Sequence, residues 1–272
     1  MTAGTLSDDL AAQKLQGTSL VGKGFTSDVY SWGEGRVLKL FHNWVPAFRA
    51  EREYRVTKAV HAAGLPVPAV YQVIQIADRH GIVFERVQGA SMLSGVQTRP
   101  WTMFKAVRQL AELHAQIHRC AAPSELPSQR DWIANGIKAA GDLSPAEKEN
   151  ALRRLEDLPD GTAVCHGDFH PENVLLTARG PIVIDWDSAT RGDPLGDVAC
   201  TSRLIQKAGL PRWAPGYMHL LLKCSRVLLH HFYMKRSLQL HAGTRQQIDA
   251  WQLPLAAAAR SWRIPTQSTA RR

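Results

Sequence analysis

The stretch "AVCHGDFHPENVLL" at residues 163–176, followed by "IDWD" at residues 184–187, is the most informative part of this chain. Asp168 stands five positions before Asn173, and Asp185 follows Asn173 after twelve more positions and a short apolar strand. An aspartate on a loop can accept the proton of a substrate hydroxyl, while an asparagine oxygen and a second carboxylate are hard ligands that suit magnesium. This combination and spacing predict phosphoryl transfer from a nucleotide.

The segment upstream contains the other parts that such chemistry requires, and they occur in the expected order. Gly22 and Gly24 in "GKGFTSDVY" predict a turn between strands whose backbone can approach phosphates closely. Ser27 stands where protein kinases usually have a third glycine. In "RVLKL", Lys39 is expected on a strand and available to the phosphates, and Glu53 in the "EREY" helix can pair with it.

The composition is that of an ordinary globular protein. Of the 272 residues, 44% are hydrophobic and 21% are charged, which suits one large domain or two lobes. The net charge is +9, but the positive residues are scattered rather than clustered with aromatic ones, which indicates a solvated surface and does not favour nucleic acid. The cysteines lie too far apart for a CxxC pair, so reduced thiols in a cytoplasm fit best.

Two segments bear on the location of the protein. The N-terminal "MTAGTLSDDLAAQKLQG" has two adjacent aspartates and lacks an apolar core of signal-peptide length, so we expect a cytoplasmic protein rather than an exported one. The longest apolar run, "YMHLLLKCSRVLLHHFYM", is interrupted by Lys223 and Arg226. It is too polar to span a bilayer and predicts a buried helix, so no membrane partner is expected.

The pattern of apolar residues changes along the chain. Residues 19–87 predict strands, with one helix in "VPAFRAEREYRVTKAVHAAG". Further on, "WTMFKAVRQLAELHAQIHR" and the capped "SPAEKENALRRLEDL" predict helices, and three or four more follow a loop-and-strand island at residues 165–187. We therefore expect two lobes, residues 1–88 and residues 89–272.

These motifs resemble the aminoglycoside phosphotransferase family, which lies within the protein-kinase-like superfamily of small-molecule kinases. The resemblance spans about residues 19–260 and rests on "HGDFHPENVLL", "IDWD" and "GDPLGDVA", with support from "GLPVP", "FERVQG" and "AELHAQIH". It implies an α+β, bilobal protein-kinase-like fold. A small strand-rich N-lobe would bind the nucleotide, and a larger helical C-lobe would carry the catalytic loop and the substrate-binding helices.

The resemblance also implies roles for individual residues. Asp168 would be the catalytic base, with Asn173 and Asp185 as ligands of Mg²⁺. Lys39 together with Glu53 would hold the α- and β-phosphates of ATP, the co-substrate.

Two further positions follow from the resemblance. Members of the family bind adenine at the link between the lobes, which maps to Glu85 to Val87 through backbone groups. Glu53 rather than Glu51 is the expected partner of the strand lysine, because its distance to "GLPVP" fits the family.

The sequence departs from the protein-kinase pattern in an informative way. Gly167 stands where protein kinases usually have the arginine that meets a phosphorylated activation loop, and "DWD" replaces "DFG". Eleven residues separate Asp185 from Asp197, and no "APE" motif follows. Because this leaves little room for an activation segment or a peptide-docking platform, we expect constitutive activity on a small hydroxylated substrate.

Other polar residues near the motifs have structural interpretations. His166 is expected to hold the catalytic loop through a hydrogen bond, and Asp197 to order the loop backbone and begin the next helix. A cap or surface role is expected for Asp187, although it could supplement metal binding. His114 and His118 are one helical turn apart and could share a metal, but no third ligand is evident nearby in the sequence, which favours packing.

Charge gives a hint about the acceptor. After Asp197 the chain has a single acidic residue, Asp249, against twelve lysines and arginines. A polycationic aminoglycoside would need several carboxylates as partners. The earlier helical region contains Glu112, Asp142, Glu147 and Glu149. A neutral or anionic hydroxylated metabolite is therefore the favoured acceptor. The case for an aminoglycoside acceptor is weakened, but this acceptor is not excluded.

The leading expectation is an ATP-dependent phosphotransferase that acts on a hydroxyl of a small molecule. Two alternatives stay open. A protein kinase is disfavoured by the missing activation segment. A kinase-shaped scaffold, which would bind nucleotide and an acidic partner or nucleic acid without catalysis, is disfavoured by the complete set of base and metal-ligand candidates.

Overall fold

The structure of the chain is a computed structural model. It describes residues 15, 17–207 and 216–262, with the side chains of residues 100 and 216–225 left out. Nearly all of the N-terminal segment on which the expectation about export was based therefore lies outside the described residues.

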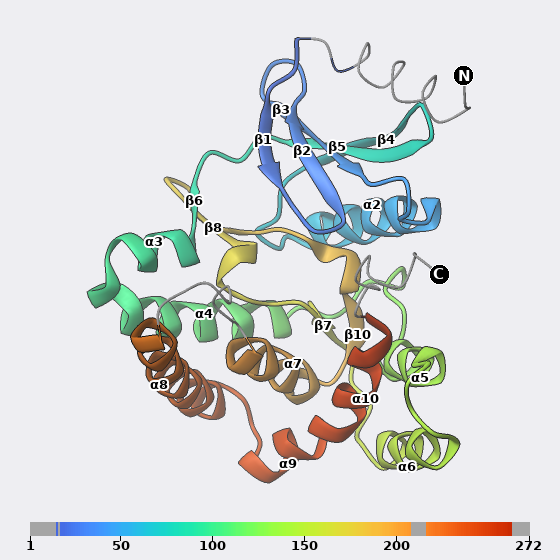
Figure 1. Ribbon diagram of the computed structural model, residues 1–272, viewed down its shortest axis with the longest axis vertical. Coiled ribbons are helices and arrows are strands. Elements are labelled where there is room, and N and C mark those ends of the chain that lie inside the picture. The colour runs from blue at the N-terminus through green and yellow to red at the C-terminus, as the bar shows by residue number, and fades with distance from the viewer. Residues whose placement is uncertain (1–14, 16, 208–215, 263–272) are drawn as a thin grey trace. The chain divides into compact units, whose positions relative to one another are not determined.

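The chain divides into two compact units (Figure 1). The first comprises residues 1–92 and 172–188, and the second comprises residues 93–171 and 189–272. The short segment that carries Asn173 and Asp185 thus belongs with the strand-rich unit, whereas Asp168 belongs to the helical one. The functional division into residues 1–88 and 89–272 stays a prediction.

An antiparallel sheet of five strands forms most of the first unit, in the order β1-β2-β3-β5-β4 (Figure 1). Side chains alternate along a strand, so Lys39 on β3 shares a face with Val37 and Phe41. Helix α2 packs against this face. The elements are β1 (Leu20–Lys23), β2 (Ser27–Ser31), β3 (Arg36–Phe41), α2 (Ala47–Ala62), β4 (Val70–Ile76) and β5 (Arg79–Glu85).

Apolar side chains cover both faces of the two central strands. One cluster consists of Leu38, Leu40, Ile76 and Val83, and the other of Phe41, Val45, Ala50, Ile82 and Phe84. A shift of one residue in the pairing of β3 would turn every side chain to the opposite face and bring the Lys39 ammonium into the apolar cluster of Leu38 and Leu40, so the cost of burying this charge fixes the register. It therefore also fixes the direction in which Lys39 points, toward α2.

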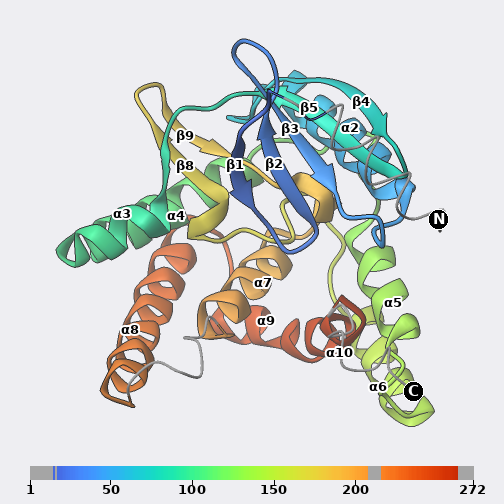
Figure 2. The ribbon, with the colours of Figure 1, turned by 45° about the horizontal axis from the view of Figure 1, so that its top comes forward.

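A small sheet of three strands completes the first unit, in the order β6-β8-β9. The β8–β9 hairpin is the yellow ribbon in Figure 2. After β9, the amide of Ile184 donates to the carbonyl of Asn173 at 3.0 Å, which joins the backbone beside Asp185 to that of Asn173. The elements are β6 (Ala90–Ser91), β8 (Val174–Thr177), β9 (Gly180–Val183) and the 3₁₀ turns η2 (Pro171–Asn173) and η3 (Trp186–Ser188).

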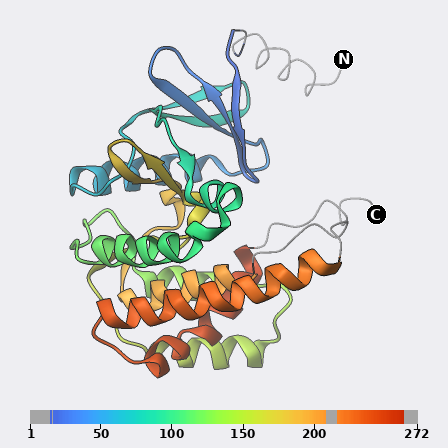
Figure 3. The same ribbon diagram turned by 90° about the vertical axis from the view of Figure 1, so that its left-hand side faces the viewer.

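The second unit is mainly helical. The long helices α4 (green) and α8 (orange) run side by side in Figure 3, and α10 packs against α5 and α6. A hairpin-like pair of short strands, β7 and β10, lies among the helices. The elements are α3 (Met92–Thr98), η1 (Pro100–Thr102), α4 (Met103–His118), α5 (Gln129–Ala139), α6 (Pro145–Glu156), β7 (Ala163–Cys165), β10 (Thr190–Gly192), α7 (Pro194–Lys207), α8 (Gly216–Leu240), α9 (Arg245–Ala250) and α10 (Gln252–Trp262).

The expected helices are present, and one more appears. Helix α6 begins with the predicted capping box, in which Ser144 and Glu147 bond each other's backbone amides. Helix α5 was not predicted. Its start is marked by Ser128, whose hydroxyl accepts from the amide of Asp131 at 3.3 Å.

The apolar run at residues 217–234 is helical as predicted and lies in α8, but the expectation of a fully buried helix was wrong for its described side chains. Tyr233 and Met234 are buried, whereas Val227 is 63% exposed and Leu228 45% exposed. The reason is that α8 contacts α4 and α7 with only part of its circumference. Among the described residues, no helix is both long enough and apolar enough to cross a membrane.

Candidate active site

A cavity of about 870 Å³ lies within the first unit. Residues expected to bind nucleotide or metal line it together, although they come from distant parts of the sequence. They are Gly22, Gly24, Ser27, Lys39, Glu53, Glu85, Val87, Asn173 and Asp185. The tertiary structure thus gathers all the site residues predicted for this unit around one cavity.

Lys39 joins two carboxylates in the wall of this cavity. Its Nζ donates to Glu53 Oε1 at 2.7 Å and Oε2 at 2.8 Å, and to Asp185 Oδ1 at 2.8 Å. The expected pairing of Lys39 with Glu53 is therefore present, and Glu51 is exposed on the opposite side of the helix turn. The side chain of Glu53 is only 2% exposed, so this ion pair is shielded from water.

The charges of Lys39 and its two carboxylate partners, Glu53 and Asp185, depend on one another. Burial lowers the pKa of Lys39, but the carboxylates of Asp185 and Glu53 outweigh it and raise that pKa above its usual value. Burial raises the pKa of Glu53, and Lys39 opposes this shift. The lysine is therefore held as a cation, which is the form that can bind phosphate oxygens.

Asp185 has an unusual backbone conformation, with φ at +67°. Aspartate tolerates this left-handed region better than most residues, but it still costs energy and commonly marks a functional position. The next residue, Trp186, is 1% exposed and its indole N–H donates to the carbonyl of Val183 at 3.0 Å. The buried indole thus anchors the turn that directs the Asp185 carboxylate toward Lys39.

The turn between β1 and β2 requires one of its two predicted glycines. The amide of Gly24 donates to the carbonyl of Ser27 at 2.8 Å, and a Cβ at Gly24 would lie 3.0 Å from the same oxygen. At Gly22, a Cβ would meet only Val29, at 3.9 Å. Gly22 therefore leaves its cavity side open to a ligand, and Gly24 permits the tight turn.

The segment from Glu85 to Val87 leaves the last strand of the large sheet. The amide of Glu85 donates to the carbonyl oxygen of Ala69 at 2.8 Å, and the amide of Arg86 donates to the carbonyl oxygen of Gly35 at 2.9 Å. The Glu85 carboxylate accepts from the Ala69 amide at 3.2 Å and from the Arg179 guanidinium. These bonds fix the backbone that lines the cavity up to Val87.

A hydrogen bond between two of its own residues holds the backbone of the loop that carries Asp168. The Asp168 amide donates to Nδ1 of the buried His166 at 3.2 Å, which confirms the expected structural role of this histidine. The Asp168 carboxylate is 36% exposed and lies 3.7 Å from Nε2 of His170. The catalytic-base candidate is thus rigid at its backbone and accessible at its carboxylate.

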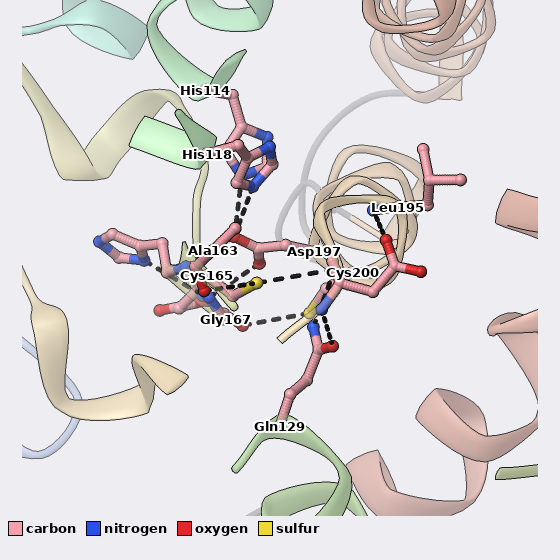
Figure 4. A network of polar contacts seen from close by, with 12 residues as sticks. His114, His118, Gln129, Ala163, Cys165, Gly167, Leu195, Asp197 and Cys200 are labelled. Atoms are coloured by element: carbon pink, nitrogen blue, oxygen red, sulfur yellow. Dashed lines mark hydrogen bonds and ion pairs between the residues drawn. The ribbon is translucent and has the colours of Figure 1, made fainter. Parts of the chain in front are cut away.

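Asp197 fixes the same loop from the side of α7 (Figure 4). Its Oδ2 accepts from the His166 amide at 2.6 Å, and its Oδ1 accepts from the Gly167 amide at 2.9 Å. The expectation that Asp197 orders the loop backbone is confirmed. It does not begin the helix, however, because α7 starts at Pro194 and the Asp193 carboxylate accepts from the Leu195 amide at 2.8 Å.

Two histidines complete the surroundings of Asp197. The Nε2 atoms of His114 and His118 lie 2.9 and 3.2 Å from Asp197 Oδ2. Asp197 is thus the third group that was not evident near the histidines in the sequence, and the three ligand atoms lie within 4.8 Å of one another. Hydrogen bonds from the ring N–H groups to the Asp197 carboxylate account for these distances, which agrees with the expected packing role of the histidines. The two histidines hold the pKa of Asp197 well below its usual value, although burial raises it.

The model of the "Phosphotransferase enzyme family" matches residues 18–236 of this sequence. The chain belongs to this family. The match confirms the resemblance to aminoglycoside phosphotransferases that the motifs indicated.

The curated relatives of this chain fall into two groups. Acyl-CoA dehydrogenase family member 11 of Gallus gallus is 30% identical over 175 residues, which cover 56% of the chain and 22% of the relative. The chain therefore spans about a fifth of the length of that protein. Aminoglycoside 3'-phosphotransferase of Streptomyces fradiae is 27% identical over 184 residues, covering 60% of the chain and 68% of the relative.

Solved structures show the same fold. The amicoumacin kinase hAmiN, in complex with AMP-PNP, Ca2+ and Ami, matches with a TM-score of 0.62 at 12% identity, covering 96% of this chain and 87% of that one. The expected α+β, protein-kinase-like fold is confirmed by this likeness.

Part of the polar network was not predicted from the sequence. Asp187 is not a cap or surface residue: it is buried and pairs with Arg49 of α2. Tyr233 donates its hydroxyl to Nδ1 of His114 at 2.7 Å, and His241 lies 2.8 Å from His118. The spacing of His114 and His118 was the available signal, but it does not reveal partners from another helix.

We expect acid to destabilise the folded chain through His114. Burial and the neighbouring His118 lower the pKa of His114 to about 3. Between its unfolded value of 6.5 and about 3, the unfolded imidazole binds a proton that the folded one does not, so stability falls as the pH decreases through this window. The slope from this group is at most about 1.4 kcal/mol per pH unit.

Urea unfolding at a series of pH values measures this effect. His114→Gln keeps a donor for Asp197 and an acceptor for Tyr233 but does not titrate, so its stability should depend less on pH than that of the wild type. His231→Gln, at an exposed position on α8, should retain the wild-type slope. Equal slopes for the wild type and His114→Gln would contradict the prediction.

Proposed function

We propose that this chain transfers the γ-phosphoryl group of ATP to a hydroxyl of a small molecule. The observation that carries the proposal is the Lys39 triad: a half-buried lysine bonded to Glu53 and Asp185 in the wall of one cavity, in a member of a phosphotransferase family. A half-buried cation that is held in place at the edge of a cavity suits phosphate oxygens. The solved neighbour hAmiN binds AMP-PNP, which supports a nucleotide as the ligand here.

The cavity offers a place for each part of ATP. Gly22 would let the backbone of β1 approach the phosphates, because its cavity side is open. For adenine, the backbone from Glu85 to Val87 is proposed. The amides of Glu85 and Arg86 already donate to carbonyls of the sheet, so the amide of Val87 is the proposed donor.

Mg²⁺ fits the donor set in the same cavity. Asn173 and Asp185 both line it and both present oxygen atoms, the ligand type that Mg²⁺ prefers. These two residues would hold the ion, which would neutralise the charge of the phosphates. Lys39 donates to Asp185 Oδ1 at 2.8 Å, so the cation proposed for the phosphates lies directly beside this proposed metal ligand.

Asp168 is proposed as the base that accepts the proton of the acceptor hydroxyl. Its carboxylate is partly exposed, while its loop is fixed by His166 and Asp197. A fixed base orients the attacking oxygen, and alignment with charge stabilisation supplies most of the catalysis in this type of reaction. No covalent intermediate on the protein is required.

The acceptor is proposed to be neutral or anionic rather than polycationic. Three of the acidic side chains of the earlier helical region are already engaged: Glu112 with Arg108 and Arg236, Asp142 with Arg260, and Glu147 in the capping box of α6. Ammonium groups of a ligand would have to displace these partners. An uncharged or acidic metabolite would leave these interactions in place.

A metabolite extract incubated with ATP and Mg²⁺ tests the proposal. We expect one class of hydroxylated compound to gain the mass of one phosphate while ADP accumulates, and the Asp168→Asn variant to give neither. A scaffold that only binds nucleotide would bind ATP and transfer nothing. A protein kinase would label polypeptides instead. Productive use of kanamycin-like compounds alone would contradict the proposed acceptor class.

The glutamates on α2 give a matched pair of variants. Glu53→Gln removes the charge that fixes Lys39, so we expect turnover to fall on the order of 10-fold to 100-fold, equivalent to about 1.4–2.7 kcal/mol. Glu51→Gln removes the same charge from an exposed site two residues away and should leave turnover unchanged. Steady-state kinetics on the acceptor found in the extract compares them, and equal losses in both variants would remove the Lys39–Glu53 pair from the mechanism.

A further inference from the structure

His118 and His241 form a row of polar contacts between two acceptors. His118 lies at the end of α4, with its Nε2 3.2 Å from Asp197 Oδ2 and its Nδ1 2.8 Å from Nε2 of His241. His241 follows α8, and its Nδ1 lies 2.9 Å from the carbonyl oxygen of Ser237. The row therefore runs from a carboxylate, through two imidazole rings, to a carbonyl.

The number of protons in this row follows from its ends. A carboxylate and a carbonyl oxygen only accept, so each end requires an N–H on the ring that faces it. The contact between the rings requires one more hydrogen, on either His118 or His241. Two neutral imidazoles carry one N–H each, which fills two of the three contacts. All three hydrogen bonds exist together only when the pair carries one additional proton and hence one positive charge.

We propose that His118 and His241 share one buried proton and act, through Asp197, as positioning residues for the loop that carries Asp168. This inference rests on the proposed function of that loop. The link is short: Asp197 Oδ2 accepts from the Nε2 of His118 and from the amide of His166, and Oδ1 accepts from the amide of Gly167. A charge-assisted bond to this carboxylate is stronger than a neutral one, so the proton tightens the anchor of the loop.

The charged and polar groups around His118 and His241 set the pH range in which the pair holds the additional proton. Burial, His118 and the nearby Arg119 lower the pKa of His241, the Ser237 carbonyl and Asp197 raise it, and the net direction is downward. His118 also faces the carboxylate of Asp193, at the start of α7, and His114, which is neutral because burial lowers its pKa to about 3. Because one additional proton serves the contact between the two rings, its gain or loss changes the hydrogen bonds of both.

The sign of the pH effect follows. Below the pKa of the pair, three hydrogen bonds join Asp197 to Ser237. As the pH rises through that pKa, one contact loses its hydrogen and two lone pairs face each other, so the hold of His118 on Asp197 weakens. The amides of His166 and Gly167, which Asp197 accepts from, should then exchange with solvent more readily.

Nuclear magnetic resonance of the ligand-free full chain tests this without any assay of catalysis. Long-range ¹H–¹⁵N spectra of the ring nitrogens should show one shared positive charge on His118 and His241 at low pH, lost in a single coupled step. Across that step, the protection factors of the His166 and Gly167 amides should fall about tenfold, as expected for the loss of one charge-assisted hydrogen bond.

Two variants complete the test. In His241→Gln the side chain can donate to His118 but cannot carry the charge, so the step in protection should disappear. His231→Gln, on the exposed side of α8, should keep the wild-type step. Two rings that titrate independently in the wild type, or a step in protection that persists in His241→Gln, would overturn the inference. Neither measurement uses ATP or an acceptor. A failure of this inference can therefore be told apart from a failure of the proposed phosphotransferase activity.

Discussion

Asp168→Asn should lower turnover on the order of 10² to 10⁴-fold, the usual contribution of a positioned general base. An amide has nearly the same size as the carboxylate but cannot accept the proton of the acceptor hydroxyl. The loop should keep its conformation, because its contacts to His166 and Asp197 use backbone amides. Nucleotide affinity should stay at the wild-type value, since the cavity that we assign to ATP is lined by other residues.

Rapid-quench measurement of ADP and phosphorylated acceptor gives the turnover, and calorimetry with a non-hydrolysable ATP analogue gives the affinity. Asp157→Asn, at the exposed C-terminal end of α6, is the matched control for loss of one negative charge in the helical unit. Wild-type turnover in Asp168→Asn would remove this residue from the mechanism. Equal losses of turnover and nucleotide affinity would instead assign it to binding.

Asp185→Asn should affect nucleotide binding as well as turnover. Asparagine tolerates the left-handed backbone that Asp185 adopts, so the turn should persist. The variant loses the charge of the proposed Mg²⁺ ligand and one of the two carboxylates bonded to Lys39. Because a bound divalent ion supplies several kcal/mol of charge stabilisation, we expect turnover to fall on the order of 10³-fold.

The distinguishing measurement is the dependence of nucleotide affinity on Mg²⁺. In the wild type the affinity should rise with Mg²⁺, and in Asp185→Asn this rise should be nearly lost. Glu34→Gln, on the exposed turn between β2 and β3, controls for the change in net charge of the same unit. A Mg²⁺ dependence identical to that of the wild type would show that other groups hold the ion.

Local patterns in the sequence predicted much of the fold. The capping box of α6 and the alternation along β3 depend on residues a few positions apart, so they are readable from the sequence. Helix α5 was not predicted because its eleven residues carry few sequence signals of a helix other than the N-cap residue Ser128. The exposure of Val227 could not be predicted either, since it depends on which part of α8 its neighbours cover.

The sequence by itself determined the family, the strand that holds Lys39 and the identity of the base and metal-ligand candidates, because motifs and periodicity are properties of neighbouring residues. Only the tertiary structure decided that Lys39 bonds Asp185 as well as Glu53, and that Asp197 accepts from both His114 and His118. These partners lie on segments far apart in the chain. Which carboxylate meets which ring is decided by how the elements pack, and burial then sets the charge that each group can hold.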